Sequence, residues 1–231
     1  EGRATRLRGN PDHPVTQGFL CGKVTRYLDK QYHPDRLLYP LRRIGAKGEG
    51  RFERISWDEA LDTIATRLTA IAAGFGPESI LPYSYAGTMG LLNGSSMDRR
   101  FFHRLGASQL DRTICAAAGT EALMDVYGTR LGVEPEQFRH ARLILAWGAN
   151  IHGTNSHLWP FIVEARRQGA RLYTIDPVVT RTARLADRHF AIYPGSDAAL
   201  AYGLMHVILA DGLEDSNYLS AQSIGLEELR K

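Results

Sequence analysis

The sequence has little cysteine, no long apolar run and no block of like charges. Its 231 residues include two cysteines, too few for a disulfide framework, and this favours a reduced, cytoplasmic setting. No apolar run approaches the roughly 20 residues that a bilayer-spanning helix needs, so we expect no direct membrane insertion. The first residue is Glu1 rather than Met. We therefore expect a longer natural chain, whose own N-terminus decides whether it carries a targeting signal.

The net charge and the absence of two nucleotide-binding motifs also limit the expected binding partners. The formal net charge is +3, and no block of five Lys or Arg residues occurs, so nucleic acid is not an expected partner. Neither G-x-G-x-x-G after a strand nor G-x-x-x-x-G-K-[ST] is present, and Gly87-Thr88-Met89-Gly90 only partly imitates the former. An ordinary NAD- or ATP-binding domain is therefore disfavoured.

Three short apolar runs, each ending in a polar corner, give the strongest indication of the fold. They cover residues 143–146, 172–175 and 190–193. Strands buried on both faces of a parallel sheet have this continuous apolar character. Helical segments at 158–167 and 198–209 alternate with them. This order predicts an α/β fold with a Rossmann-like open, mostly parallel sheet flanked by helices.

The polar corners predict the kind of ligand. Ligands of open α/β sheets bind outside the carboxyl ends of the strands. Gly148 and Gly195 let the backbone approach a bulky group closely, and N–H groups at a helix start attract phosphate. Asp176 and Asp197 supply carboxylate acceptors for ribose hydroxyls or for the N–H edge of guanine. Together they indicate a nucleotide with a pyrophosphate. The alternative is that these corners are ordinary turns.

The remaining segments predict smaller elements. Ser56-Trp57-Asp58-Glu59 is a capping-box signature, and it begins an amphipathic helix that reaches about Ala73. We further expect strand-like alternation over residues 1–8, a short helix within 18–32, a loop over 39–54, a strand over 79–84, and helices over 96–105 and 116–127. Residues 1–50 then form a small N-terminal β-rich cap, and residues 51–231 form the α/β region.

Several short motifs, in order along the chain, resemble one enzyme family. They are Gly9-Asn10-Pro11-Asp12-His13-Pro14, Gly18-Phe19-Leu20-Cys21-Gly22-Lys23, His33-Pro34-Asp35-Arg36-Leu37, Phe52-Glu53-Arg54-Ile55-Ser56-Trp57-Asp58-Glu59-Ala60, Thr182-Ala183 and Ala186-Asp187, with the three corners. The chain resembles the molybdopterin oxidoreductases of the dimethyl sulfoxide reductase and formate dehydrogenase superfamily, as an internal fragment of a catalytic subunit.

The resemblance implies a cofactor, a division of the chain and a set of binding residues. The cofactor is bis-molybdopterin guanine dinucleotide with molybdenum or tungsten. Residues 1–50 are then the remnant of an iron-sulfur and cap region, and residues 51–231 are an incomplete cofactor-binding region. The implied cofactor-binding residues are Trp147, Gly148, Asn150, Thr154, Asn155, Asp176, Pro177, Thr180, Thr182, Pro194, Gly195 and Asp197.

Cys21 and Lys23 match residues beside an iron-sulfur cluster in the resembled family. Cys21 corresponds to the last of four cysteines that hold a 4Fe–4S cluster, and Lys23 to a lysine between cluster and pterin. A cluster needs about four thiolates, so we expect it in the full-length protein and not in this fragment. The alternatives are a small buried cysteine and a surface lysine.

Cys115 is the candidate molybdenum ligand. Its separation from Cys21 is comparable to that between cluster and metal ligands in the family. A soft thiolate suits molybdenum, and the predicted helix after Cys115 favours the thiolate. The alternative is a buried cysteine at a helix start. Formate dehydrogenases have His after this position, whereas Ala116 stands here, so a formate-oxidising mechanism is disfavoured. The sequence does not assign that role to His103 or His152.

Two functions follow from the resemblance. The first is an oxidoreductase that performs two-electron redox chemistry on a small-molecule substrate and passes electrons through the pterin, Lys23 and the cluster. Its electron partner is an iron-sulfur or membrane-anchor subunit, and the fragment alone is expected to be inactive. The second is a non-catalytic cofactor-binding or structural subunit of a respiratory redox complex.

Overall fold

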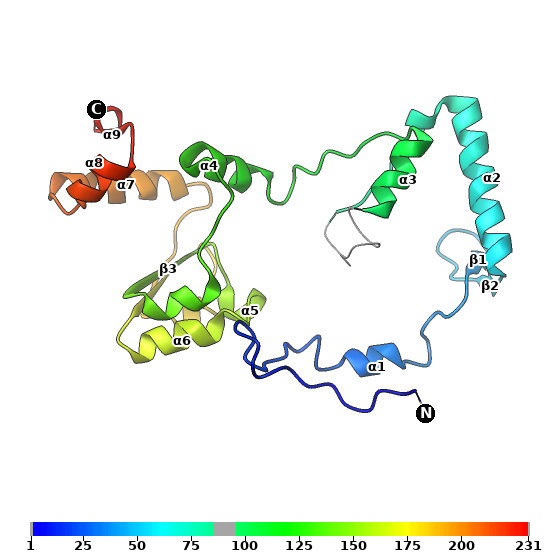
Figure 1. The fold of residues 1–231 in the computed structure, drawn as a ribbon, viewed down its shortest axis with the longest axis horizontal. Coiled ribbons are helices and arrows are strands. Elements are labelled where there is room, and N and C mark those ends of the chain that lie inside the picture. Colours follow the sequence, from blue (N-terminus) through cyan, green and yellow to red (C-terminus); the bar gives the residue numbers. More distant parts are fainter. Residues whose placement is uncertain (1, 86–95, 231) are drawn as a thin grey trace. The chain divides into compact units, whose positions relative to one another are not determined.

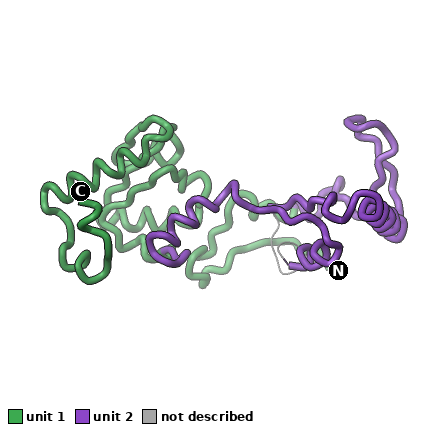
Figure 2. The backbone as a smooth tube through the Cα atoms, turned by 90° about the horizontal axis from the view of Figure 1, so that it is seen from above, with its two compact units in different colours: residues 1–28, 133–231 green, residues 29–132 purple. Residues whose placement is uncertain are grey.

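The computed structural model describes residues 2–85 and 96–230. The glycine run at 87–90 therefore lies outside the described residues. The chain divides into two compact units, coloured separately in Figure 2. Unit 1 comprises Glu1–Leu28 with Val133–Lys231, and unit 2 comprises Asp29–Gly132.

Unit 1 is built on a three-stranded parallel sheet in the order β3-β4-β5. Its strands are β3 (Leu143–Trp147), β4 (Arg171–Ile175) and β5 (Arg188–Phe190). Helix α6 (Trp159–Arg167) connects β3 to β4 and lies against the sheet (Figure 1). A helical crossover between parallel neighbours is the expected βαβ unit. The predicted α/β class with a parallel sheet is confirmed.

The core of unit 1 lies between α6 and one face of the sheet. Ile162 and Leu172 have no exposed surface, and Ile144 and Ala146 are buried beside them. Successive strand residues point to opposite faces. Leu143 and Leu145 accordingly face away from the core, and they are 51% and 46% exposed.

The other elements of unit 1 are short helices and one long helix. They are η2 (Pro135–His140), α5 (Ile151–Thr154), η3 (Ala183–Leu185), α7 (Asp197–Ala210), α8 (Ser216–Gln222) and α9 (Leu226–Leu229). Ser196 lies at the N-cap position of α7. Its hydroxyl nevertheless donates to Tyr193 O at 2.6 Å and makes no cap bond.

Unit 2 contains a small antiparallel hairpin followed by helices. Its elements are β1 (Leu41–Arg43), β2 (Phe52–Arg54), α2 (Trp57–Phe75), η1 (Pro77–Ser79), α3 (Met97–Leu105) and α4 (Ala117–Tyr127), and α1 (Tyr27–Gln31) crosses from unit 1. The hairpin is a small antiparallel sheet in the N-terminal part of the chain, where a β-rich cap was expected, although it lies in the segment that was expected to be a loop.

The predicted cap of α2 is present. Ser56 Oγ accepts from Glu59 N at 3.1 Å. The Glu59 side chain does not complete the reciprocal half of the capping box. It pairs instead with Arg42, which also pairs with Glu53. One arginine thus connects the hairpin to the start of α2.

Four local expectations are wrong. Residues 2–8 form no strand, because alternation alone supplies no pairing partner. The expected loop over 39–54 contains β1 and β2, which pair with each other. The expected strand over 79–84 is η1 followed by irregular chain.

The expected strand at 190–193 is the fourth error, because β5 begins and ends earlier, at Arg188 and Phe190. Asp187 sets this start, since its backbone N donates to Leu172 O and its carboxylate accepts from Leu172 N, each at 2.8 Å.

None of the helices in the described part of the chain has the length and apolar character needed to cross a bilayer.

Candidate functional site

Polar side chains gather at the carboxyl ends of the strands in unit 1. We call this region the dinucleotide edge, after the ligand that the sequence predicts for it; it comprises Trp147, Gly148, Asn150, Asp176, Thr182, Gly195 and Asp197, with the turn residues around them. One pair consists of Asn150, after β3, and Thr182, before η3. Asn150 Oδ1 accepts from Thr182 N at 3.3 Å and from its hydroxyl at 3.2 Å. The Thr182 hydroxyl in turn accepts from His152 N at 3.0 Å. Thr182 is fully buried, so these bonds fix two separate corners to each other.

A second pair connects β3 to α7. The indole Nε1–H of Trp147 donates to Asp197 Oδ1 at 2.6 Å. Asp197 is the first residue of α7, where a negative charge interacts favourably with the helix dipole. The carboxylate is exposed, and its Oδ2 makes no hydrogen bond within the described part of the chain. It is therefore available as an acceptor.

Two glycines leave open space beside these pairs. Gly148 and Gly195 have φ of 57° and 85°, in the left-handed region that favours glycine. A Cβ added at either position would meet no atom within 4 Å. Gly148 N nevertheless donates to Ile175 O at 2.8 Å, so the corner continues the β3–β4 pairing. A bulky group can approach the backbone at both corners.

Asp176 and Thr180 follow β4 and are engaged in the turn that they form. Asp176 Oδ1 accepts from Val178 N at 2.8 Å, as in an ordinary Asx turn. Thr180 Oγ1 accepts from Ala183 N at 3.1 Å. Both side chains are half-buried. These local bonds are those of an ordinary turn, the alternative that the sequence left open. The second carboxylate oxygen of Asp176 takes no part in them.

The other residues predicted for this edge lie in the same corners. Thr154 ends α5, and its hydroxyl donates back to Asn150 O at 3.0 Å. Asn155 is the C-cap residue of α5. Pro177 and Pro194 are exposed members of the turns after β4 and β5.

The loop that carries Cys21 and Lys23 contacts the α/β part of unit 1. The rings of Phe19 and His157 meet edge to face, with centroids 5.3 Å apart. Cys21 is half-buried and Lys23 is exposed. Hydrogen bonding from the backbone of Val24, and then of Lys23, lowers the pKa of the Cys21 thiol, with a smaller effect from the Lys23 charge. These interactions favour the thiolate, the form that ligates metals.

At the start of this loop, the backbones of Gly9 and Gly18 lie close together. A Cβ on Gly9 would overlap the carbonyl group of Gly18. Between them, His13 Nδ1 accepts from Thr16 N at 3.1 Å. Only glycine fits at position 9 without displacing the chain that leads to Cys21.

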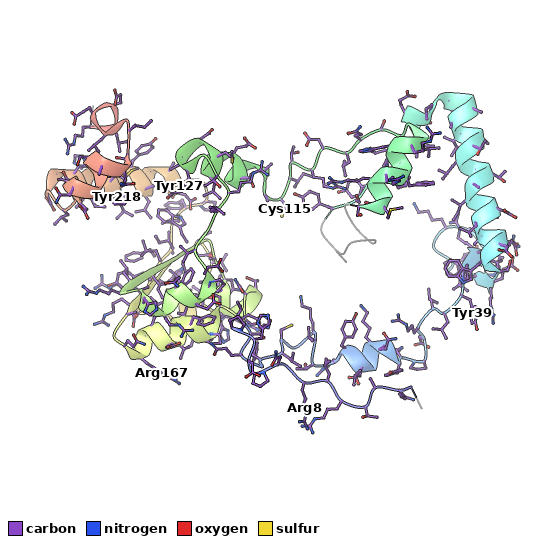
Figure 3. The ribbon with its side chains drawn as sticks, viewed as in Figure 1. Arg8, Tyr39, Cys115, Tyr127, Arg167 and Tyr218 are labelled. Atoms are coloured by element: carbon purple, nitrogen blue, oxygen red, sulfur yellow. The ribbon has the colours of Figure 1, made fainter. Side chains whose placement is uncertain are left out.

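Cys115 lies in unit 2, on the irregular segment that leads into α4 (Figure 3). Its backbone N donates to the Tyr85 hydroxyl at 3.2 Å. The residue is exposed, not buried. The helix begins at Ala117 with Ala116 as N-cap, so Cys115 precedes the helix, as expected. Among the described residues, no three His, Cys, Asp or Glu side chains gather as a metal site.

Comparison with known proteins identifies the relatives of the chain. The sequence profile of the family described as "Molybdopterin oxidoreductase" matches residues 36–228. The chain belongs to the molybdopterin oxidoreductase family. "Probable oxidoreductase YoaE" of Bacillus subtilis (strain 168) is 46% identical over 231 residues, which are 100% of this chain and 34% of that protein. "Probable oxidoreductase YyaE" of the same organism is 34% identical over 233 residues, with the same two coverages.

A solved structure has a similar fold. Acetylene hydratase from Pelobacter acetylenicus matches with a TM-score of 0.73 and 33% identity, over 94% of this chain and 30% of that one. The chain thus spans about a third of the relatives it matches.

Membership of the molybdopterin oxidoreductase family supports a molybdopterin cofactor containing molybdenum. The dinucleotide edge fits such a group in its open glycine corners and its available carboxylate oxygens. A 4Fe–4S cluster does not fit within this chain by itself, because the chain has two cysteines and they lie in different units.

Sequence reasoning missed several residues around these sites. His152 is one, since its ring meets Trp159 edge to face at 4.9 Å and its Nδ1 is buried without a hydrogen-bond partner among the described residues. Tyr85 and Arg112 are others, because their partners lie 30 and 28 residues away. Short sequence patterns do not reveal such long-range pairs.

Proposed function

We propose that the full-length protein binds bis-molybdopterin guanine dinucleotide, with molybdenum or tungsten, and performs two-electron redox chemistry on a small-molecule substrate. Family membership supports the cofactor class. The observation that supports the dinucleotide most strongly is the arrangement at the carboxyl ends of β3, β4 and β5. There, two open glycine corners lie beside carboxylates that retain available oxygens.

Each side chain of the edge has a role in this proposal. Asp197 accepts from the N–H groups of guanine, in the orientation that Trp147 fixes. Asp176 accepts from ribose hydroxyls. Gly148 and Gly195 admit the diphosphate to the backbone. The hydrogen bond between half-buried Asn150 and fully buried Thr182 holds two corners at a fixed separation, which makes the edge rigid before the ligand arrives.

Thr154, Asn155, Pro177, Thr180 and Pro194 complete the proposed binding set by shaping the turns. Their hydrogen bonds join residues that are close in sequence. For example, the Thr154 hydroxyl donates to Asn150 O, and Thr180 Oγ1 accepts from Ala183 N. Their contribution is therefore the geometry of the corners more than direct contact with the nucleotide.

Cys115 is the proposed ligand of the metal. The bound cofactor supplies the change of oxidation state at the metal. The exposed Cys115 thiol supports this role, because a ligand must be reachable, and the Tyr85 hydroxyl fixes the backbone beside it. Lys23 is proposed to place its charge between pterin and cluster in the complete protein, with Cys21 as one cluster ligand.

The domain boundaries, the electron partner and the cellular compartment are also parts of the proposal. Residues 1–50 belong to the iron-sulfur and cap region, and residues 51–231 to the cofactor-binding region. An iron-sulfur or membrane-anchor subunit is the proposed electron partner, and the cytoplasm the proposed compartment. One relative is named "Perchlorate reductase subunit alpha", from Dechloromonas aromatica (strain RCB), which fits a multisubunit assembly.

The deciding experiment compares Cys115→Ala with wild type in the full-length protein purified without oxygen. We expect turnover to be abolished while the guanine nucleotide content stays at the wild-type level, because the dinucleotide edge is untouched. Cys115→Ser should be milder, because a serine oxygen can replace the thiolate as a harder ligand. Ile114→Ala is the control, since Ile114 is 90% exposed.

Three results would reject parts of the proposal. Wild-type rates in Cys115→Ala, or an unchanged molybdenum–sulfur shell in its X-ray absorption spectrum, reject the ligand role. Guanine nucleotide without metal in the wild-type protein indicates the non-catalytic subunit. The absence of both rejects the cofactor.

A further inference from the structure

A groove in unit 2 lies beside the segment that leads to Cys115. Its volume is about 470 Å³, and its walls come from the segment 82–84, from α3 and from the segment 108–112. Arg99 and His103 of α3 are both among its lining residues. They are four positions apart, which places them on one face of the helix. None of these residues belongs to the dinucleotide edge.

Arg112 is fixed in the wall of the groove. Its Nε donates to Ser84 O at 2.9 Å, and its Nη2 donates to Ser84 Oγ at 2.6 Å. The residue is half-buried. A guanidinium carries five N–H donors, so three remain for other acceptors. The two bonds to Ser84 reduce the entropy that this side chain would lose on binding a ligand.

The charge balance of the groove is positive. The lining includes two arginines, Arg99 and Arg112, and one carboxylate, Asp98, whose Oδ1 accepts from Ser96 N at 2.8 Å. The side chains of Arg99 and His103 make no hydrogen bond or ion pair with the described part of the chain. Guanidinium groups bind planar and tetrahedral oxyanions through paired N–H donors. The groove is therefore suited to a small anion.

Two of the segments that line the groove also continue to the contact that positions Cys115. Ser84 is bonded to Arg112, and the next residue, Tyr85, is bonded to the backbone of Cys115. These two bonds join the segment 82–85 to the segment 112–115 side by side. An anion held by Arg112 is consequently held next to the loop of the proposed metal ligand.

We infer that this groove binds a small oxyanion of the nitrate or sulfate type, through Arg99, Arg112 and His103, as the substrate of the proposed oxidoreductase. The oxyanion is the species reduced: it would take two electrons from the proposed electron partner, and with two protons the oxygen atom that it loses would leave as water. The role as substrate rests on the proposed function, whereas the binding of the anion does not. The inference restricts the substrate class to anions, and it gives His103 a place in the groove that the sequence left unassigned.

The test measures nitrate and sulfate binding by calorimetry in the full-length, cofactor-loaded protein, at an ionic strength held constant with chloride. Arg99→Gln should weaken binding about ten- to hundred-fold, the range for a hydrogen bond to a charged group. Arg100→Gln is the matched control, because it removes the same charge from the same helix outside the groove; its affinity should equal that of wild type. Arg112→Gln also removes the Ser84 bonds, so Arg99→Gln is the deciding variant.

Three results would overturn the inference. The first is a wild-type protein that binds neither ion. The second is an equal effect of Arg99→Gln and Arg100→Gln, which indicates general electrostatics. The third is a loss of guanine nucleotide from Arg99→Gln, which indicates a cofactor phosphate in the groove. Failure of the proposed function would give a different result from these three. The wild-type protein would then contain no metal or guanine nucleotide but would still bind the anion, and the assignment of the groove would stand.

Discussion

Trp147 and Asp197 are joined by a 2.6 Å hydrogen bond although 50 residues separate them in the sequence. Trp147 ends β3, and Asp197 begins α7. The bond holds one carboxylate oxygen of Asp197 and leaves the other available. A tryptophan at the end of a strand thus determines how a carboxylate two strands further along the chain is presented.

Removing this carboxylate should weaken binding of the proposed dinucleotide. Asp197→Ala in the full-length protein should lower affinity about ten- to hundred-fold, because a charge-assisted hydrogen bond is lost. Trp147→Phe should lower it less, since the carboxylate remains but loses its orientation. The measurement is guanine nucleotide per protein at limiting cofactor. Trp57→Phe is the control, since Trp57 is 63% exposed and belongs to unit 2. Wild-type nucleotide content in Asp197→Ala removes Asp197 from the site.

The Asn150–Thr182 pair should be important for stability. Thr182→Val preserves shape but leaves Asn150 Oδ1 and the His152 N–H without the hydroxyl. An unsatisfied buried polar group costs about 1–3 kcal/mol, and we expect a loss of that size in urea unfolding. Thr63→Val should change stability by less than about 0.5 kcal/mol, because the Thr63 hydroxyl donates within exposed α2. Equal effects of the two changes would contradict the importance of the buried pair.

Gly9→Ala should open the loop that carries Cys21. The new Cβ would overlap the Gly18 carbonyl, and overpacking of this kind costs about 1–3 kcal/mol. We expect faster proteolysis between residues 9 and 18 and a lower iron content in the full-length protein. Gly22→Ala, where a Cβ meets nothing within 4 Å, is the matched control. Identical digestion of the two variants would show that the chain relaxes around the clash.

Asp187 should make the stability of unit 1 dependent on pH. The backbone N–H of Leu172, with Arg166 and Arg171, lowers the pKa of Asp187 below its ordinary value of 3.8. The ionised carboxylate therefore stabilises the fold above pH 3.8, and this contribution is lost as the pH falls through the lowered pKa. Asp187→Asn should be less stable than wild type at neutral pH, and the difference should shrink below about pH 4. A difference that does not change with pH in urea unfolding would contradict the effect.

Sequence patterns predicted the elements that depend on interactions between residues close together in the chain. The apolar runs located β3 and β4, and the capping signal at Ser56 located the start of α2. Gly106 ends α3 in the left-handed conformation, directly after the helix predicted over 96–105. Each of these outcomes depends on residues within about one turn of helix or one strand.

The errors have long-range causes. The β1–β2 hairpin depends on Arg42, which pairs with Glu53 and Glu59. The segment 79–84 is held by single bonds, such as Ser108 N to Ile80 O, and not by a ladder. For the candidate site, the polar corners indicated Asp197, whereas its partner Trp147 and the pair Asn150 and Thr182 entered only through family resemblance. The groove at Arg99 and Arg112 had no sequence signal.

The parallel sheet also has a consequence for the order of folding. Its paired residues are near in sequence, with Leu143 opposite Arg171 and Tyr173 opposite Arg188. The Phe19–His157 contact joins residues much further apart. Contacts that close shorter loops form faster. We therefore expect the strands and α6 to form first and the Cys21 loop to dock later, so that the corners after the strands exist while the cysteine loop is still open.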